Sequence, residues 1–445
     1  MGLIAATVGS AVGLGNVWRF PAVAQQNGGA AFLLIYIGCV FLLGIPVMMS
    51  EFAIGRGGHS NAIGSFRKLA PDSLWWVTGL LGILASYLIL SYYMVVSGWT
   101  MEYFVHSVTG FLYDGHTPAG DNAVYVNKMN TLIRGDVQPV VWTFIMLILN
   151  LVILLKGVNK GIERMSNILM PVLFVLLLAF CIFALHMPKA ADGLEFFLKP
   201  DFSKVTGSTF IAALGQAFYS LSLGMGILLT FAAYYPQDTK LTRTATTVAS
   251  LDFLVAFLMG IIIFPAVKSF GLDADPEALQ GTTLVFVTLP EVFNQMPLPH
   301  LWSALFFLLL GIAALTSTIS LAEVSISLVQ DRLKLTRMKS VLVVVLPLFV
   351  LSSINSLSLG RWSDITIFGK TIFDALDYVT SNVMLPLCAL FACLFVGWRM
   401  KGDFLRRQMT NYDSMTSPMY PVIRATIRYV APVLILTIML SSLLK

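Results

Sequence analysis

Long runs of apolar residues constrain what this chain can fold into more than any other feature. A helix needs ~20 mostly apolar residues to cross the hydrocarbon core of a bilayer. Eleven such runs follow one another, with soft edges: 2–25, 30–55, 74–105, 138–156, 164–186, 207–235, 243–270, 299–330, 339–357, 371–399 and 421–444. Membrane β-strands are shorter and alternate in polarity. The runs therefore predict an all-α polytopic membrane protein with eleven transmembrane helices.

The composition excludes most soluble classes of protein. Of 445 residues, 57% are hydrophobic and only 11% are charged, whereas ordinary soluble domains are ~45–50% apolar and ~25% charged. The net charge of +5 comes from 28 Lys and Arg against 23 Asp and Glu, which is too sparse for a face that binds a polyanion. A soluble enzyme, a disordered protein and a nucleic-acid binder are therefore poor interpretations.

The distribution of positive charge predicts the orientation in the membrane. Lys and Arg are about twice as frequent in the loops after the even-numbered runs as in the other loops. Cytoplasmic loops carry such an excess, so the even-numbered loops are expected in the cytoplasm. The predicted spans then place the N-terminus inside and the C-terminus outside.

Two of the runs contain residues that disfavour a continuous helix. Residues 8–16 and 218–226 each place glycines and small polar side chains near the middle of a span, where helix propensity is poorest. Close helix packing through small residues is the alternative explanation. Because the two runs are five spans apart, we expect two unwound segments in two halves of opposite orientation, approximately 1–186 and 207–399. Both halves belong to one transmembrane domain of residues 1–445, which ends in an additional helix at 421–445. Inverted repeats with broken helices are typical of secondary transporters.

Several motifs resemble one known family. Residues 9–21, 27–32, 44–51, 160–164, 222–226 and 315–317 closely resemble the neurotransmitter:sodium symporter family, in order and over essentially the whole chain. The resemblance is to a bacterial amino-acid member, and it implies sodium-driven uptake by alternating access in the bacterial inner (plasma) membrane. It implies a transporter and no enzymatic activity.

The resemblance implies two Na⁺ sites. The first would be formed by the Ala11 carbonyl, Asn16, Ser220, Asp252 and the substrate carboxylate. The second would be formed by the carbonyls of Gly9, Val12 and Ala313 and the hydroxyls of Thr316 and Ser317. Hard cations prefer such oxygen ligands. Alternatively, the two hydroxyls of the second set bond only to their own helix.

The resemblance also implies a substrate pocket. Its lining would be Ser10, Ala11, Gly15, Ile89, Tyr93, Tyr219, Ser220, Ser222, Met225, Ser317 and Leu321. Monoamine members of the family carry Asp at the position of Gly13, so an α-amino acid fits better, with its carboxylate near sodium and Tyr93. The apolar Ile89, Met225 and Leu321 favour a hydrophobic side chain, and the flexible Met225 favours a large or aromatic one. Another small zwitterion, resembling GABA or betaine, is the alternative substrate.

Asp252 predicts independence from chloride. It falls where chloride-dependent relatives carry a neutral Asn, and Ala256 falls where they carry Ser. An isolated carboxylate inside a membrane costs several kcal/mol unless it is compensated. A fixed negative charge beside sodium would replace the anion.

The remaining charges within the spans predict gates. Arg19 and Asp377 match the outer charged gate, with Tyr93 and Tyr219 as an aromatic lid beneath it. Tyr234 and Asp331 match the inner gate, whose arginine in relatives lies upstream of Met1. Three further carboxylates are expected to bond unwound backbone, with a proton relay as the alternative: Glu51, Glu323 and Asp374.

Three other function classes compete with a transporter. A non-transporting amino-acid sensor on the same fold would not need two sodium sites. An intramembrane enzyme is disfavoured because no Gly-x-Ser-x-Gly or His-Glu-x-x-His motif occurs. A channel is disfavoured because the polar residues converge on one site instead of lining a continuous pore.

Overall fold

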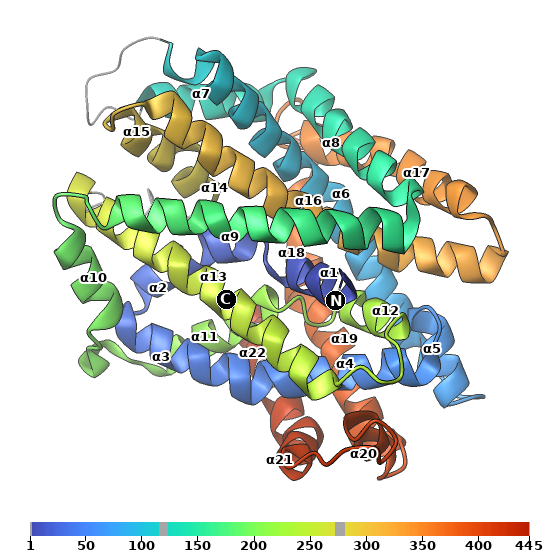
Figure 1. Cartoon of the computed structure of the whole chain (residues 1–445). Coiled ribbons are helices and arrows are strands. Elements are labelled where there is room, and N and C mark those ends of the chain that lie inside the picture. Colours follow the sequence, from blue (N-terminus) through green and yellow to red (C-terminus); the bar gives the residue numbers. More distant parts are fainter. Residues whose placement is uncertain (1, 115–122, 272–280, 445) are drawn as a thin grey trace.

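The computed structural model describes residues 2–114, 123–271 and 281–444, and these are almost entirely helical (Figure 1). The α-helices are α1 Gly2–Ala11, α2 Phe20–Gln26, α3 Ala30–Cys39, α4 Ile45–Gly58, α5 Ala62–Leu69, α6 Trp76–Thr109, α7 Ala123–Arg134, α8 Gln138–Leu155, α9 Arg164–Ala184, α10 Ala190–Leu198, α11 Gly207–Ser220, α12 Ile227–Ala233, α13 Leu241–Phe270, α14 Gly281–Thr283, α15 Leu289–Asn294, α16 Pro299–Leu333, α17 Arg337–Leu357, α18 Ile372–Val379, α19 Leu385–Leu394, α20 Phe404–Met409, α21 Tyr420–Ala425 and α22 Ala431–Leu443.

Short π and 3₁₀ segments continue many of these helices. The π segments are η1 Gly15–Arg19, η2 Val40–Gly44, η4 Val158–Glu163, η8 Leu284–Thr288, η9 Thr380–Met384, η10 Phe395–Arg399 and η11 Thr426–Val430. The 3₁₀ segments are η3 Phe111–Tyr113 and η5 Phe202–Lys204. Strands β1 (Thr366–Ile367) and β2 (Lys370–Thr371) form an antiparallel hairpin.

Nine helices among the described residues are long and apolar enough to cross a membrane. They are Ala30–Gly58, Trp76–Thr109, Gln138–Leu155, Val158–Ala184, Leu241–Phe270, Pro299–Leu333, Arg337–Leu357, Ile372–Arg399 and Tyr420–Leu443. The other two predicted spans, 2–25 and 207–235, are the ones that the structure interrupts. The prediction of an all-α membrane protein with two broken helices is therefore confirmed.

The second broken helix unwinds because its residues adopt left-handed backbone. α11 ends at Ser220, and α12 begins only at Ile227. Between them Ser222, Gly224 and Gly226 have φ values of 53°, 80° and 72°. A Cβ atom on Gly224 would collide with the carbonyl oxygen of Leu385, so this close approach requires glycine.

The first broken helix is interrupted between Ala11 and Gly15. α1 ends at Ala11, and the helical path resumes at Gly15. The long helices α6 and α16 pack along each other, and α16 also packs against α1 (Figure 1). The helices around both breaks are thereby held in the interior of the bundle.

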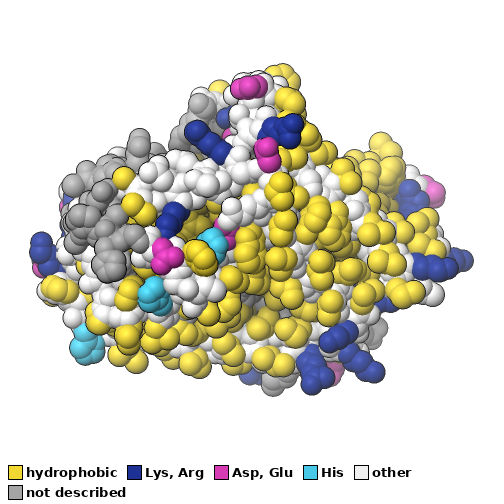
Figure 2. Space-filling model, turned by 90° about the horizontal axis from the view of Figure 1, so that it is seen from above, with side chains coloured by type: hydrophobic (Ala, Val, Ile, Leu, Met, Phe, Trp, Pro, Cys, Tyr) yellow, Lys and Arg dark blue, Asp and Glu magenta, His cyan; other side chains and the backbone are white. Residues whose placement is uncertain are grey.

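The surface agrees with a membrane environment. Hydrophobic side chains cover much of the middle of the face shown in Figure 2, whereas charged side chains lie mostly towards its edges. Many large apolar side chains of the spanning helices are exposed, including Val175 of α9, Val350 of α17 and Val433 of α22. Such surface is stable where lipid replaces water.

Candidate functional site

A cavity lies between the two helix breaks. Its lining residues are Ser10, Ala11, Gly13, Leu14, Gly15, Ile89, Tyr93, Tyr219, Ser220, Ser222, Met225, Ile227, Ser317 and Leu321. All the residues predicted to line a substrate pocket are in this set. The structure adds Gly13, Leu14 and Ile227 to this lining. Gly13 and Leu14 lie in the same break as predicted lining residues, whereas Ile227 begins α12 and carried no motif signal.

Side chains from other helices hold the first break in place. The Leu14 N–H donates to the hydroxyl oxygen of Tyr93 at 3.3 Å, and the Gly13 N–H donates to Asn16 Oδ1 at 3.1 Å. Ser222 Oγ, in the second break, donates to the Ser10 carbonyl at 2.8 Å. Because Tyr93 accepts with its oxygen, its own hydroxyl proton remains able to donate to a ligand.

Asp252 is a buried carboxyl residue that contacts Ser220 of the cavity lining. It is fully buried, on α13. Its Oδ1 accepts from Asn16 Nδ2 at 2.8 Å, and the Ser220 hydroxyl lies 2.9 and 2.8 Å from its two carboxylate oxygens. Asn16 Nδ2 also lies 3.1 Å from the Asp252 carbonyl. The structure thus brings together three of the four residues predicted for the first Na⁺ site through their own hydrogen bonds.

The fourth predicted group of that site is the carbonyl of Ala11. Ala11 is the last residue of α1 and lines the same cavity. Among the described residues, no backbone N–H donates to its oxygen. A helix-terminal carbonyl without a partner, next to a carboxylate and a hydroxyl, is a set of oxygens that suits a hard monovalent cation.

The groups predicted for the second Na⁺ site lie where α1 meets α16. Ser317 Oγ lies 3.5 Å from the Gly9 carbonyl, and a Cβ on Gly9 would be 3.2 Å from the Cβ of Thr316. Thr316 Oγ1 donates within its own helix, 3.1 Å from the carbonyls of Ile312 and Ala313. The predicted carbonyl of Val12 follows directly after α1. The atoms that could bind a cation here are again all oxygens, which suit Na⁺.

Gly13 keeps the cavity open between the two sides of the site. A Cβ at this position would lie 3.0 Å from Ser317 Oγ and 3.3 Å from the Tyr93 hydroxyl. Gly15 is similarly constrained, since a Cβ there would lie 3.1 Å from the ring of Tyr219. The absence of a side chain at both glycines therefore leaves room in the cavity, and it also favours the break in the helix.

The two predicted partners of the outer gate do not touch each other. The Arg19 guanidinium lies over the ring of Tyr219, 4.4 Å from its centroid. Asp377 instead accepts from the hydroxyls of Tyr92 at 3.0 Å and Ser381 at 3.1 Å. No ion pair joins Arg19 to Asp377 within the described parts of the chain. Tyr219, which lies beneath Arg19, and Tyr93 both line the cavity. Their role as a lid stays a prediction.

Tyr234 and Asp331, the two residues predicted for the inner gate, bond to different partners. The Tyr234 hydroxyl donates to Glu323 at 3.0 Å. Glu323 also forms a bidentate ion pair with Arg337, whose Nη1 and Nη2 lie 2.9 and 2.7 Å from Oε1 and Oε2 of the carboxylate. Asp331 lies two turns further along α16 and accepts from Asn61 instead. Arg337 can reach back to α16 because Lys334 adopts left-handed backbone and reverses the chain.

The three additional carboxylates differ in their partners. Glu51 Oε1 accepts from the Gly224 N–H at 2.7 Å, which confirms the expected bond to unwound backbone. For Glu323 the expectation was wrong, because this carboxylate pairs with Arg337. It was also wrong for Asp374, which bonds to Thr371 at the exposed start of α18.

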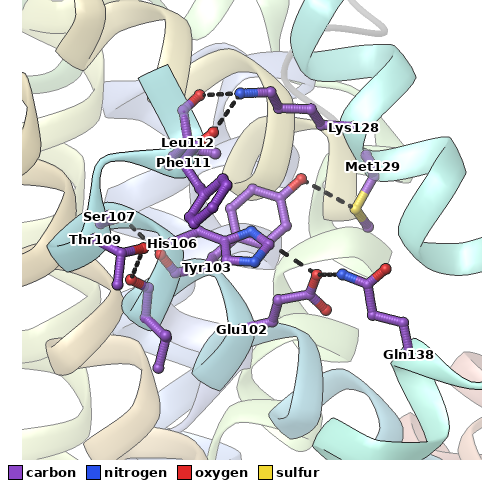
Figure 3. A network of polar contacts seen from close by, with 11 residues as sticks. Glu102, Tyr103, His106, Ser107, Thr109, Phe111, Leu112, Lys128, Met129 and Gln138 are labelled. Atoms are coloured by element: carbon purple, nitrogen blue, oxygen red, sulfur yellow. Dashed lines mark hydrogen bonds and ion pairs between the residues drawn. The ribbon is translucent and has the colours of Figure 1, made fainter. Parts of the chain in front are cut away.

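Glu102 is a buried carboxylate that the sequence reasoning missed, because it stands alone near the end of an apolar run. It accepts from Gln138 at the start of α8, and its second oxygen has no hydrogen-bond partner among the described residues (Figure 3). The neighbouring Lys128 donates to the carbonyls of Phe111 and Leu112, both at 2.6 Å (Figure 3). This network fastens α7 and α8 to the end of α6, and none of its members lines the cavity between the breaks.

Two broken helices with a cavity between them are typical of secondary transporters. The chain matches the family model described as "Sodium:neurotransmitter symporter family" over residues 1–124 and 123–445. It belongs to the sodium:neurotransmitter symporter family, and it is a sodium-dependent transporter of the membrane and not an enzyme.

Relatives and a solved structure agree with this assignment. The chain is 35% identical over 441 residues to the uncharacterized sodium-dependent transporter YhdH of Bacillus subtilis, covering 99% of this chain and 96% of the relative. It is 36% identical over 444 residues to an uncharacterized sodium-dependent transporter of Haemophilus influenzae, covering 98% and 95%. The crystal structure of MhsT in complex with L-phenylalanine is similar with a TM-score of 0.88 and 40% identity, covering 99% and 98% of the two chains.

Proposed function

We propose that this transporter couples the entry of Na⁺ to the uptake of a hydrophobic or aromatic L-amino acid by alternating access. The observation that carries the proposal is the cavity between the two breaks, where one wall is apolar and the other offers backbone and hydroxyl groups. The similarity to MhsT, whose structure was solved with L-phenylalanine, supports the same substrate class.

The cavity suits the three parts of an α-amino acid. The carboxylate would bind the first Na⁺ and the proton of Tyr93, while the ammonium group would bind carbonyls that the breaks leave without helical partners. Ile89, Met225 and Leu321 provide an apolar surface for the side chain. Gly13 supplies no carboxylate that would favour an amine without its own acid group.

Two Na⁺ would support this binding, one at each predicted site. The first is formed around Asp252 and Asn16, directly beside the substrate, and it couples Na⁺ to the substrate carboxylate. The second lies where α1 meets α16, so it favours conformations in which these two helices are close. A cation can shift such an equilibrium only by binding one conformation better than the other.

Uptake into liposomes tests the proposal. Purified protein is reconstituted and supplied with labelled Phe, Trp, Leu, GABA or betaine, with an inward gradient of Na⁺ or of K⁺. We expect Na⁺-dependent uptake of the hydrophobic amino acids and none of GABA or betaine. Binding of Phe without uptake would favour an amino-acid sensor, and uptake of GABA or betaine alone would favour the alternative substrate class.

The charge of Asp252 supports transport that does not need chloride. This fixed carboxylate is buried beside the predicted first Na⁺ site, where it can balance the cation. We expect the same uptake in chloride and in gluconate buffers, and we expect Asp252→Asn to lower apparent Na⁺ affinity and to make uptake depend on chloride. Asp252→Glu keeps the carboxylate at the same position and is the matched control. A chloride requirement in the unsubstituted protein contradicts the proposal.

The orientation and the two-halves organisation belong to the same proposal. Loops after the even-numbered spans are expected in the cytoplasm of a bacterial inner membrane, with the N-terminus inside and the C-terminus outside. Single cysteines at Lys156 and at Lys189 test this orientation, because an impermeant thiol reagent on intact cells should label only Lys189→Cys. Labelling of Lys156→Cys alone would reverse it.

A further inference from the structure

A group of four cations gathers where η10 and η11 pack together. We call Arg399, Lys401, Arg424 and Arg428 the basic cluster. Gly397 lets the two segments touch, since a Cβ there would lie only 3.0 Å from the Cα of Arg428. Trp398 Nε1 donates to the Arg428 carbonyl at 2.9 Å and locks this contact.

Arg428 is held in position but lacks an acceptor. Its guanidinium lies over Trp398, 4.3 Å from the ring centroid, and 5.5 Å from that of Tyr429. Its Nε is buried and has no hydrogen-bond partner among the described residues. Stacking on aromatic rings orients a guanidinium without using its N–H donors. The donors of Arg428 are therefore left without an acceptor by the part of the chain that the structure describes.

Neighbouring arginines on the same face of the molecule are paired with acids. Arg406 lies 3.2 Å from Asp413, and Arg407 lies 3.1 Å from Asp403. In the basic cluster, by contrast, no member has a carboxylate within ion-pair distance over the described ranges. The positive-inside tendency explains why cations occur on this face, but it does not explain why these four remain unpaired.

The surroundings of the basic cluster indicate the type of partner. Trp398 and Tyr429 are 55% and 56% exposed, as side chains at the boundary between hydrocarbon and headgroups are. Val433, one turn further along α22, is 62% exposed. A partner that fits both surfaces has an anionic head and apolar chains.

We propose that the basic cluster binds the phosphodiester headgroup of an anionic phospholipid, whose acyl chains lie along the exposed face of α22. Arg428 and Arg424 would contact the phosphate oxygens, since arginine matches phosphate with two parallel hydrogen bonds. Arg399 and Lys401 add charge at the same level of the membrane. Basic pockets between transmembrane helices bind anionic headgroups in this way.

Lipid binding to the purified full chain tests the proposal. Phosphatidylglycerol and phosphatidylcholine with identical acyl chains are titrated in nonionic detergent, and bound lipid is counted by native mass spectrometry. Each cation near an anionic headgroup contributes ~1 kcal/mol, so we expect at least about tenfold tighter binding of phosphatidylglycerol and its loss in Arg424→Gln/Arg428→Gln. Arg406→Gln/Arg407→Gln removes the same charge from paired positions and should change the affinity by less than about twofold.

A second variant and a competition experiment separate lipid binding from misfolding and from binding of free phosphate. If Arg428→Gln misfolds, as judged by gel filtration, Arg424→Gln/Lys401→Gln tests the cluster without disturbing the aromatic stack. Inorganic phosphate and glycerol phosphate are added as competitors, and displacement of the lipid at equal concentration would show a phosphate site instead of a lipid site. Equal affinity for both lipids, or an equal loss in both double variants, would also overturn the proposal.

Discussion

At the scale of single residues, the proposed first Na⁺ site is formed by side chains that come from different helices and bond to one another. Asp252 of α13, Asn16 of η1 and Ser220 of α11 are far apart in sequence and meet through hydrogen bonds of 2.8–3.0 Å. The sequence could predict these residues because their motifs are distinctive. It could not predict that Asn16 directs its amide nitrogen, instead of its oxygen, at Asp252, because that choice depends on the surrounding donors.

Gly13 gives a prediction at this scale. We expect Gly13→Ala to weaken amino-acid binding by about tenfold or more, because an added methyl group in a filled site typically costs ~1–3 kcal/mol. The new Cβ would press on Ser317 Oγ and the Tyr93 hydroxyl. Equilibrium binding of labelled Phe to purified protein measures the effect. Gly215→Ala is the control, since a Cβ on that helical glycine meets nothing within 4 Å. Equal losses in both variants would show a general effect of alanine.

At the scale of elements, the connection between α16 and α17 forms a contact that the sequence did not predict. The motifs assigned Tyr234 and Asp331 to an inner gate, because both positions resemble that gate in relatives. The structure joins Tyr234 to Glu323 and Glu323 to Arg337. A three-residue turn decides this outcome, and its geometry could not be read from composition or hydropathy.

This network gives a prediction for the two helices. Glu323 is fully buried, so Arg337→Gln leaves an uncompensated carboxylate, a loss that typically costs ~3–5 kcal/mol. We expect the melting temperature in detergent to fall and the inner side of the transporter to open more often. Thermal unfolding and the reactivity of a cysteine at Thr7, whose hydroxyl touches Tyr235 near the same side, measure the two effects.

Two variants check that explanation. Glu323→Gln/Arg337→Gln removes both charges and should recover much of the lost stability. Arg361→Gln breaks the exposed pair with Asp136, whose atoms are 3.8 Å apart, and should change little. If the double variant is no more stable than Arg337→Gln alone, the ion pair is not the cause.

At the scale of the whole molecule, Na⁺ should stabilise the folded transporter. A ligand that binds only the native state adds about 2.7 kcal/mol at a concentration 100 times its Kd. We expect NaCl to raise the melting temperature relative to KCl at equal ionic strength, and Phe to raise it further only when Na⁺ is present. Fluorescence-monitored unfolding measures both shifts.

The matched variant for this prediction removes one proposed ligand from each of the two proposed Na⁺ sites. Ser317→Ala with Asp252→Ala should abolish the difference between Na⁺ and K⁺. Ser353→Ala, whose hydroxyl only bonds back to Phe349 in α17, should leave the difference unchanged. A Na⁺ shift that survives the Ser317 and Asp252 changes would place the cation elsewhere.

The overall architecture was predictable because hydropathy and small-residue patterns act over whole spans. Runs of apolar residues determined which helices cross the membrane, and clusters of glycine determined which two helices break. Contacts such as Arg337 with Glu323, or Gln138 with Glu102, were not predictable, because a single side chain reaching across a turn leaves no periodic signal.

The side-chain acceptors at the breaks have a consequence for hydrogen exchange. The N–H groups of Gly13, Leu14 and Gly224 lie at the breaks, yet each donates to a side chain. Gly13 donates to the buried Asn16, Gly224 to the buried Glu51, and Leu14 to the partly buried Tyr93. We therefore expect their amide hydrogens to exchange with deuterium as slowly as those of the neighbouring helices, and Glu51→Ala to speed exchange selectively at Gly224. The breaks would then be irregular in shape but as rigid as the helices that they interrupt.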